Sequence, residues 1–264
     1  MRATAHGLFV TGTDTGVGKT RIATALLRAL ATAGFRAVGM KPVAAGVEPS
    51  TGTNADVLEL RSAGNVEAPF ADCNPYAFTE PVAPHLAAES AGVTIALSRI
   101  VDAYGRLCAQ ADARVVEGAG GALVPLDAQL DMLDIAVALR LEILLVVGVR
   151  LGCLNHALLT ALAVRRRGLV LRAWIANVLP PRMPLADRNI DALTERLGLA
   201  PLVVVGPGDV PSFDGDSLAM LGFADEAFAI RANIQGLQRA RVKPTRVFSA
   251  CDLKPPDVAL PRRE

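Results

Sequence analysis

The amino-acid sequence predicts an α/β fold, with a mainly parallel sheet covered by helices on both faces. Short, almost entirely apolar runs suited to buried strands alternate with longer segments whose apolar residues recur at helical spacing. With 264 residues, 52% of them hydrophobic, the chain can enclose one large core. No internal repeat or linker interrupts the pattern before residue 223. We therefore expect one domain over residues 1–223.

The first half of the chain begins with an apolar run at 7–11, expected to be a strand. Helical spacing follows over 19–33 and ends at Gly34, a residue common after helix ends. A second strand is expected over 35–41, stopped by Pro42, and a short helix over 54–62, with Asn54 as its N-cap. Three prolines make 73–84 an expected loop, before a short helix within 82–90 and a longer one over 94–111.

The second half repeats the alternation with clearer strands. Strands are expected over 114–117, 143–149, 171–177 and 202–205, and helices over 132–141, 154–167 and 186–197. Beyond residue 223 the pattern weakens, and the last residues are rich in proline and charge. We expect 224–264 to be a C-terminal extension that is partly disordered or loosely docked.

Composition argues against several classes of function. The net charge of +1 gives no global field to attract nucleic acid or a membrane surface. Four cysteines without C-x-x-C spacing and three histidines make a zinc site or a disulfide framework improbable and fit a reducing cytosol. The apolar run at 143–149 is too short to span a bilayer, and residues 1–8 are too short and mixed for a signal peptide. We expect a cytoplasmic protein with no nucleic-acid or membrane partner.

A glycine-rich segment joins the first expected strand to the first expected helix. From Leu8 to Thr20 it reads LFVTGTDTGVGKT. Glycines let backbone N–H groups converge on phosphate oxygens, and the positive end of the following helix points at them. Lys19 is expected to reach the β- and γ-phosphates, and Thr20 to offer its hydroxyl to Mg²⁺. Five residues separate Gly12 from Gly18, one more than the strict phosphate-loop pattern allows.

Two acidic residues are candidates for completing a Mg²⁺ site. Glu117 ends a buried strand, and in a parallel sheet its carboxylate emerges at the edge where the glycine-rich loop also lies. Asp56 stands at the start of a short helix and is either a further ligand or a carboxylate that stabilises the helix N-terminus. Glu117 also admits the plainer interpretation of a solvated strand end.

Lysine is scarce, which draws attention to Lys41. Of the 27 basic residues only four are lysines, and two of these are Lys19 and Lys41. A lysine offers a compact, rotatable ammonium where arginine offers a rigid fork. A specific role for both lysines is therefore expected.

Several segments together resemble the dethiobiotin synthetase family, a branch of the P-loop NTPase lineage. They are TGTDTGVGKT from Thr11, KPVAAG from Lys41, NPYAFTEPVAPHLAA from Asn74, VVEGAGG from Val115, GVRLGCLNHALLT from Gly148, and WIAN ending at Asn177. The likeness runs from about residue 9 to residue 222 in a consistent order. The five-residue loop spacing is itself the variant found in that family.

The resemblance implies an ATP- and Mg²⁺-dependent ligase of biotin biosynthesis. Such an enzyme closes a cyclic urea from 7,8-diaminononanoate and CO₂ to give dethiobiotin, through a carbamate and a carbamic-phosphoric anhydride. It implies Lys41 and Lys19 as catalytic residues that neutralise charge between the γ-phosphoryl group and the carbamate. It also implies a homodimer with the substrate site at the interface.

The resemblance also assigns binding residues. Those expected at ATP are Gly16, Val17, Gly18, Lys19, Thr20, Arg21, Asp56, Glu117, Gly118, Ala119, Gly120, Asn177, Pro207, Gly208 and Asp209. Those expected at the substrate are Thr15, Lys41, Ala45, Gly120, Leu151 and Asn155. Those expected at the metal are Thr20, Asp56 and Glu117.

Two of these assignments concern particular ends of the ligands. Asn177 is expected to read the base, with residues 207–209 on its other side. Asn155 is expected to reach across the dimer interface to the distal carboxylate of the substrate. Its turn precedes a helix N-terminus, which favours anions; the alternative interpretation of Asn155 is a plain N-cap.

The sequence departs from the family at four positions. Ala45 stands where serine is common, Gly16 where an acidic residue is common, and Val178 where aspartate is frequent. A tyrosine that the family can carry near Asn189 is absent. These changes bear on substrate affinity and nucleotide choice, which the sequence leaves open.

Two other classes of P-loop protein are alternatives. An amidotransferase-type ligase would add a glutaminase module with a catalytic cysteine and histidine, for which no region is evident. A partitioning switch ATPase would carry an extra lysine early in the loop, where this chain has Thr13, Asp14 and Thr15. Its membrane-bound forms end in a basic amphipathic helix, whereas the basic segment 238–246 is broken by Pro244.

Overall fold

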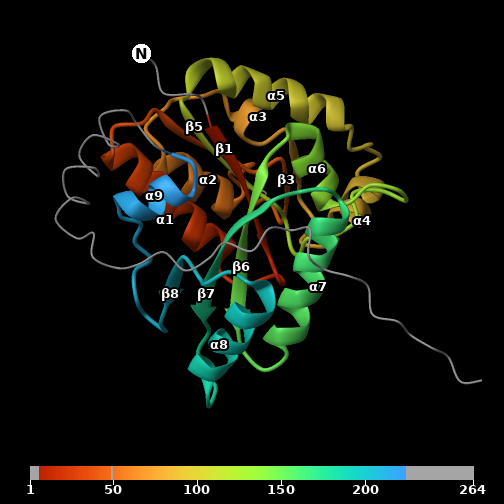
Figure 1. Ribbon diagram of the computed structural model, residues 1–264. Helices are drawn as coiled ribbons and strands as arrows, with labels where there is room; N and C mark the ends of the chain where they lie inside the picture. The colour runs from red at the N-terminus through yellow and green to blue at the C-terminus, as the bar shows by residue number, and fades with distance from the viewer. Residues whose placement is uncertain (1–5, 49, 224–264) are drawn as a thin grey trace, which may run out of the picture.

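A six-stranded parallel sheet forms the centre of the molecule (Figure 1). The computed structural model describes residues 6–48 and 50–223. Neighbouring strands of the sheet run parallel in the order β2-β5-β1-β6-β7-β8. The strands are β1 (His6–Gly12), β2 (Ala37–Met40), β5 (Ala113–Glu117), β6 (Glu142–Val149), β7 (Leu171–Val178) and β8 (Val203–Val205). The predicted fold class is confirmed.

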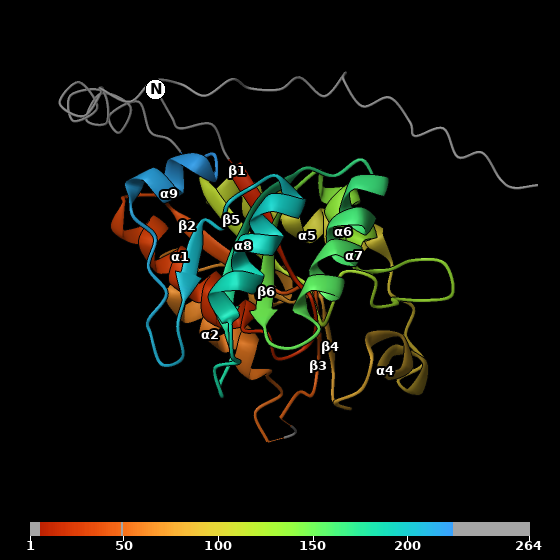
Figure 2. The ribbon, with the colours of Figure 1, turned by 60° about the horizontal axis from the view of Figure 1, so that its bottom comes forward.

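Helices cover both faces of this sheet (Figures 1 and 2). One side carries α1 (Lys19–Thr32), α2 (Ala55–Ala63) and α9 (Gly215–Met220). The other side carries α5 (Leu97–Gln110), α6 (Met132–Leu139), α7 (Cys153–Arg166) and α8 (Ala186–Leu197). Two short helices, α3 (Phe70–Cys73) and α4 (Pro84–Ser90), belong to the segment between α2 and α5.

The central strand β1 shows why its middle residues, 8–10, are all apolar. Leu8 and Val10 pack in the core beneath α1, while Phe9 between them packs in the core on the opposite face. Successive side chains of a strand point to opposite faces, so a strand covered on both sides needs an apolar residue at every position. The same alternation holds in β5, where Val115 and Val116 belong to different cores.

The expected strands of the main sheet are found with ends shifted by at most two residues, and the expected helices with ends shifted by at most three. The prediction of a loop over residues 73–84 is wrong for part of this segment. Tyr76–Phe78 forms strand β4, which pairs in parallel with β3 (Val43–Ala45) in a small second sheet. Three-residue strands are too short to show alternation, and their pairing partner lies more than 30 residues away along the chain. The expected extension over 224–264 lies outside the described residues.

The carboxyl ends of the main strands meet at one edge of the sheet. Register pairs Val10 with Glu117, Gly12 with Val146, and Asn177 with Val205. The glycine-rich loop, the end of β5 and the ends of β7 and β8 therefore share that edge. In open parallel sheets this edge is where ligands bind. No helix in the described part of the chain combines the length and apolar character needed to cross a bilayer.

Candidate active site

The glycine-rich loop is held between strand β6 and helix α1. The Thr13 backbone N–H donates to the Val146 carbonyl over 3.0 Å, and Thr13 Oγ1 accepts from the Gly148 N–H at 3.3 Å. Gly18 is the N-cap of α1 with φ 93°, and a Cβ there would lie 2.5 Å from Asn177 Nδ2. Glycine is therefore required at position 18, both for its left-handed backbone and for this close approach.

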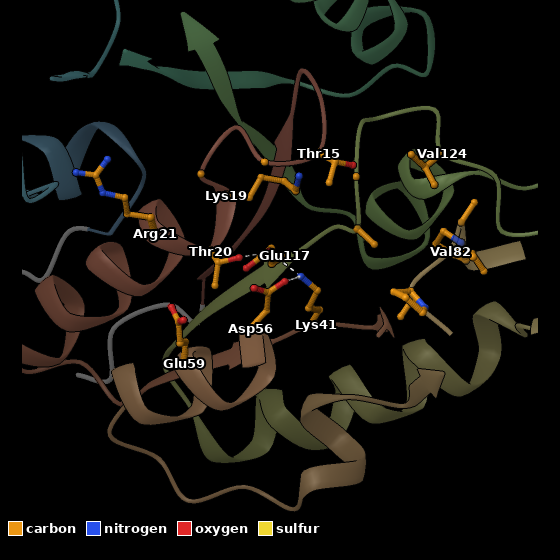
Figure 3. A pocket seen from close by; sticks show the side chains of 18 residues that line it. Thr15, Lys19, Thr20, Arg21, Lys41, Asp56, Glu59, Val82, Glu117 and Val124 are labelled. Atoms are coloured by element: carbon orange, nitrogen blue, oxygen red, sulfur yellow. Dashed lines mark hydrogen bonds and ion pairs between the residues drawn. The ribbon is translucent and has the colours of Figure 1, made fainter. Parts of the chain in front are cut away.

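Four side chains from four different elements meet beneath that loop (Figure 3). Lys41, which follows β2, donates from Nζ to Asp56 Oδ2 and, over 2.8 Å, to Glu117 Oε1. Thr20, in the first turn of α1, donates from Oγ1 to the same Glu117 oxygen over 2.9 Å. Asp56 lies in the first turn of α2, which Asn54 caps by accepting from the Asp56 N–H. The structure thus brings together Thr20, Lys41, Asp56 and Glu117, as expected from the sequence.

Burial governs the electrostatics of this cluster. Glu117 is 1% exposed, and burial raises the pKa of its carboxyl despite the opposing attraction of Lys41. Burial disfavours the charged form of Lys41, but the attraction of Glu117 and Asp56 is stronger than this effect and raises the Lys41 pKa. For Asp56 the attraction of Lys41 overcomes burial and lowers the pKa. The two carboxylates therefore stabilise a positive charge that lies between them, here the Lys41 ammonium.

Lys19 differs from Lys41 because it bonds no carboxylate. Its Nζ donates to the Asp14 carbonyl over 3.0 Å, on the loop side of the cavity. Burial lowers the Lys19 pKa, more than the attraction of Glu117 raises it. An anionic ligand such as a phosphate would stabilise its charged form.

The oxygen atoms of the cluster fit a hard divalent cation. Thr20 Oγ1, Asp56 and Glu117 supply a hydroxyl and two carboxylates, the donor types that Mg²⁺ prefers alongside phosphate oxygens and water. Glu117 Oε2 is buried and has no hydrogen-bond partner among the described residues. Such an atom is costly to bury unless something pairs with it. The described part of the chain contains no group of three or more His, Cys, Asp or Glu that could hold a metal, so at this site two carboxylates and a hydroxyl would have to be joined by phosphate oxygens or water.

The cluster forms the floor of a cavity of about 810 Å³. This volume lies within the range of roughly 300–1,000 Å³ typical of small-molecule sites. Twelve of the expected site residues line the cavity: Thr15, Gly16, Gly18, Lys19, Thr20, Arg21, Lys41, Ala45, Asp56, Glu117, Ala119 and Gly120.

Six further lining residues are not among those expected from the sequence. Glu59 lies one turn beyond Asp56 on α2, Val124 follows the glycine-rich turn after β5, and residues 81–84 form an apolar wall. The wall belongs to the segment NPYAFTEPVAPHLAA, whose likeness to the family is visible in the sequence although no role follows from it. Only the tertiary structure brings this wall against the cavity.

The turn after β5 presses against the glycine-rich loop. Gly120 has φ 66°, and a Cβ there would lie 2.8 Å from Val124 Cγ2 and 3.4 Å from Thr15 Oγ1. Thr15 and Val124 also line a second hollow of about 400 Å³, bounded on its far side by His156, Leu159 and Thr160 of α7. The two hollows therefore meet at Thr15 and Val124.

The residues expected at the nucleotide base lie behind the loop and do not line the cavity. Asn177 is buried, donates from Nδ2 to the Val17 carbonyl over 2.8 Å, and accepts from Arg21 Nη1. Residues 207–209 follow β8, whose Val205 pairs with Asn177. Val17 packs in the core, and the Gly118 N–H donates to Val10. Their assignment to ATP stays a prediction.

Leu151 and Asn155 lie away from the cavity of their own chain. Leu151 is 89% exposed, and Asn155 is an exposed residue in the first turn of α7. The alternative interpretation of Asn155 as an N-cap is wrong, because Gly152, with φ 95°, occupies that position. Their role toward a substrate also stays a prediction.

Comparisons with known proteins identify the family of the chain. The family model described as an AAA domain matches residues 6–212. The chain is 52% identical over 193 residues to the ATP-dependent dethiobiotin synthetase BioD of Xanthomonas axonopodis pv. citri, covering 72% of this chain and 86% of that protein. It is 51% identical over 203 residues to the protein of the same name in Nitrosospira multiformis, covering 77% and 88%.

Similarity to solved structures is more distant. The MinC:MinD cell division protein complex of Aquifex aeolicus aligns at 13% identity with a TM-score of 0.47, covering 92% of this chain and 99% of that chain. This likeness does not bear on function. Identities above 50% over most of both sequences, with the matching family model, do decide the family. The chain belongs to the ATP-dependent dethiobiotin synthetase family.

Proposed function

We propose that the protein is a ligase of biotin biosynthesis that uses ATP to close the cyclic urea of dethiobiotin from 7,8-diaminononanoate and CO₂. One amine adds to CO₂ and loses a proton to give a carbamate. A carbamate oxygen takes the γ-phosphoryl group of ATP, releasing ADP and forming a carbamic-phosphoric anhydride. The second amine then attacks the carbonyl carbon, loses its proton, and expels phosphate as the ring closes.

The observation that carries this proposal is the convergence of Lys19, Lys41 and two carboxylates in one cavity beneath the glycine-rich loop. Phosphoryl transfer to a carbamate brings two anions together, so the site must supply positive charge where they meet. Lys19 neutralises the phosphate side and Lys41 the carbamate side. Thr20, Asp56 and Glu117 would hold Mg²⁺, which would supply further positive charge at the phosphates.

The substrate end of the cavity is largely apolar. Ala45 and residues 81–84 offer no side-chain hydrogen-bond donor, and Thr15 supplies a hydroxyl opposite them. An apolar wall disfavours charged ammonium groups, and the attacking amine must be unprotonated. We assign this wall to the diamine end of the substrate.

We propose a homodimer in which Asn155 and the turn at Leu151 bind the distal carboxylate of a substrate held mainly by the partner subunit. Leu123, Leu159 and Leu162 are each about half exposed, near the second hollow and along α7. Exposed apolar residues of this kind favour a protein contact. Sedimentation or light scattering at micromolar concentration tests this, and a strict monomer would contradict the role of Asn155.

The reaction itself is tested with purified protein, the diamine, bicarbonate, Mg²⁺ and ATP. We expect ADP and dethiobiotin in equal amounts, with dethiobiotin identified by mass spectrometry. ATP turnover that does not depend on the diamine would contradict the ligase assignment. The same assay with CTP, GTP and UTP measures nucleotide preference, on which Gly16 and Val178 bear.

We further propose that the reaction takes place in the cytosol, where ATP is available. The cysteines in the described residues support a reducing compartment, since Cys73, Cys108 and Cys153 are all free thiols. Fractionation of cells that produce the full chain would check this location.

A further inference from the structure

Lys41 is bonded to both of the carboxylates that would bind a divalent cation, through one oxygen of each. Its ammonium donates to Asp56 Oδ2 and Glu117 Oε1, and that Glu117 oxygen also accepts from Thr20 Oγ1. These partners belong to the three residues that the proposed function assigns to Mg²⁺. Lys41 is 5% exposed, so its charge is neutralised by this cluster and little by solvent.

We propose that Lys41 and the divalent cation exclude each other from Asp56 and Glu117, so that metal binding releases the Lys41 ammonium into the cavity. This inference rests on the proposed function for the identity of the metal ligands. The two carboxylates carry two negative charges, and Lys41 neutralises one of them. A divalent cation bound to the same two carboxylates, whether through the free Glu117 Oε2 or through the oxygens that Lys41 now uses, would repel its ammonium at short range.

The structure indicates which part of Lys41 moves. Its backbone N–H donates to the Cys73 carbonyl over 2.8 Å, and its carbonyl accepts from Asn74 Nδ2 over 2.7 Å. Pro42 follows directly and fixes the next φ angle. The main chain is therefore held on both sides, and the exchange is confined to the flexible four-carbon side chain.

The released ammonium can enter the cavity that Lys41 lines. Lys41 lines the cavity that also contains Thr15, Ala45 and Gly120, the residues assigned to the substrate. When Nζ leaves Asp56 and Glu117, it enters that space and faces the carbamate that the proposed reaction forms there. Metal loading and positioning of the catalytic lysine then become one coupled event, and the lysine is withheld from substrate until the metal is bound.

Two measurements with metal ions alone, without nucleotide or diamine, test this exchange. The first is Mn²⁺ affinity by electron paramagnetic resonance. Lys41→Met removes the competing ammonium, and we expect it to bind Mn²⁺ at least fivefold more tightly than the unmodified chain, within the usual range of roughly 5–150-fold for coupled sites. The matched control is Lys19→Met, which removes a buried lysine that bonds no carboxylate, and we expect a change below threefold.

The second measurement follows Lys41 in the unmodified protein, and Lys41→Met serves only to assign its signal. The chain has only four lysines, so [ε-¹³C]lysine labelling gives a simple spectrum in which Lys41 is identified by its loss in Lys41→Met. We expect the Lys41 signal to shift saturably with Mg²⁺, over the concentrations at which Mg²⁺ displaces bound Mn²⁺.

Three outcomes would overturn the exchange. These are equal or weaker Mn²⁺ binding by Lys41→Met, no Mn²⁺ binding by either protein, and a Lys41 signal that stays fixed while Mg²⁺ displaces Mn²⁺. Because neither measurement involves turnover, failure of the exchange is distinguishable from failure of the ligase assignment, which the diamine assay decides.

Discussion

Replacing Gly120 by alanine should damage the active site more than it damages the fold. Gly120 has φ 66°, and a Cβ there would lie 2.8 Å from Val124 Cγ2. The left-handed backbone costs about 1–2 kcal/mol for an alanine. Carbon atoms pack at about 3.5–4.0 Å, so Val124 or the turn must also move by roughly 0.7 Å or more. Gly120 adjoins Thr15 in the cavity, where a shift of about 1 Å can cost ~10²-fold in rate.

The matched control is Gly168→Ala, in the turn after α7. Gly168 has φ 69°, close to that of Gly120, but nothing lies within 4 Å of an added Cβ. Urea unfolding should show a loss of about 1–2 kcal/mol in Gly168→Ala and at least that loss in Gly120→Ala, where Val124 must also move. Only Gly120→Ala should lose about tenfold or more in kcat/KM for the diamine. If Gly120→Ala keeps kcat/KM within twofold of the unmodified protein, or Gly168→Ala loses as much, the steric reasoning is wrong.

Three further changes have definite expected results. Lys41→Ala should lower kcat by about 10²–10³-fold, because it removes a charge that stabilises the transition state. The circular dichroism spectrum should stay unchanged. An unaltered kcat would remove Lys41 from the mechanism. His6 is half-buried, and burial lowers its pKa below 6.5. The unfolded chain therefore binds a proton first, and the free energy of unfolding should fall as pH drops below about 6.5, by at most ~1.4 kcal/mol per pH unit. His6→Gln should flatten that slope in urea unfolding between pH 7 and 5, and an unchanged slope would assign it to other groups. Trp174→Phe should lower the free energy of unfolding by about 1–3 kcal/mol, because the buried indole N–H donates to the Leu199 carbonyl over 2.8 Å. A loss below ~0.5 kcal/mol would show that this carbonyl finds another partner.

The main sheet could be predicted from the sequence because each of its strands is a run of apolar residues bounded by glycine, proline or a helix. Its strands are covered on both faces, and this leaves an unbroken apolar signature. The small sheet of β3 and β4 could not be predicted. Its two strands have three residues each and stand in proline-containing segments, and only the tertiary contact between them makes them strands.

For the candidate site, the sequence indicated which residues matter better than how they interact. Lys41 and Asp56 could be selected by lysine scarcity and by resemblance, yet no spacing predicts that Lys41 bonds both Asp56 and Glu117. That contact depends on β2 and β5 being neighbours in the sheet. Glu59 was missed because a single exposed glutamate on a helix has no pattern to distinguish it.

The strand order has a consequence for how the protein is made. The glycine-rich loop follows β1, but β1 is flanked by β5 and β6, which begin at residues 113 and 142. During synthesis at about 5–20 residues per second, β1 would wait roughly 7–27 s for its second partner. Both edges of this apolar strand stay unpaired until β5 has been made, and one edge stays unpaired until β6 has been made. The glycine-rich loop is thus synthesised early, but the strands on both sides of β1 that support it are complete only late.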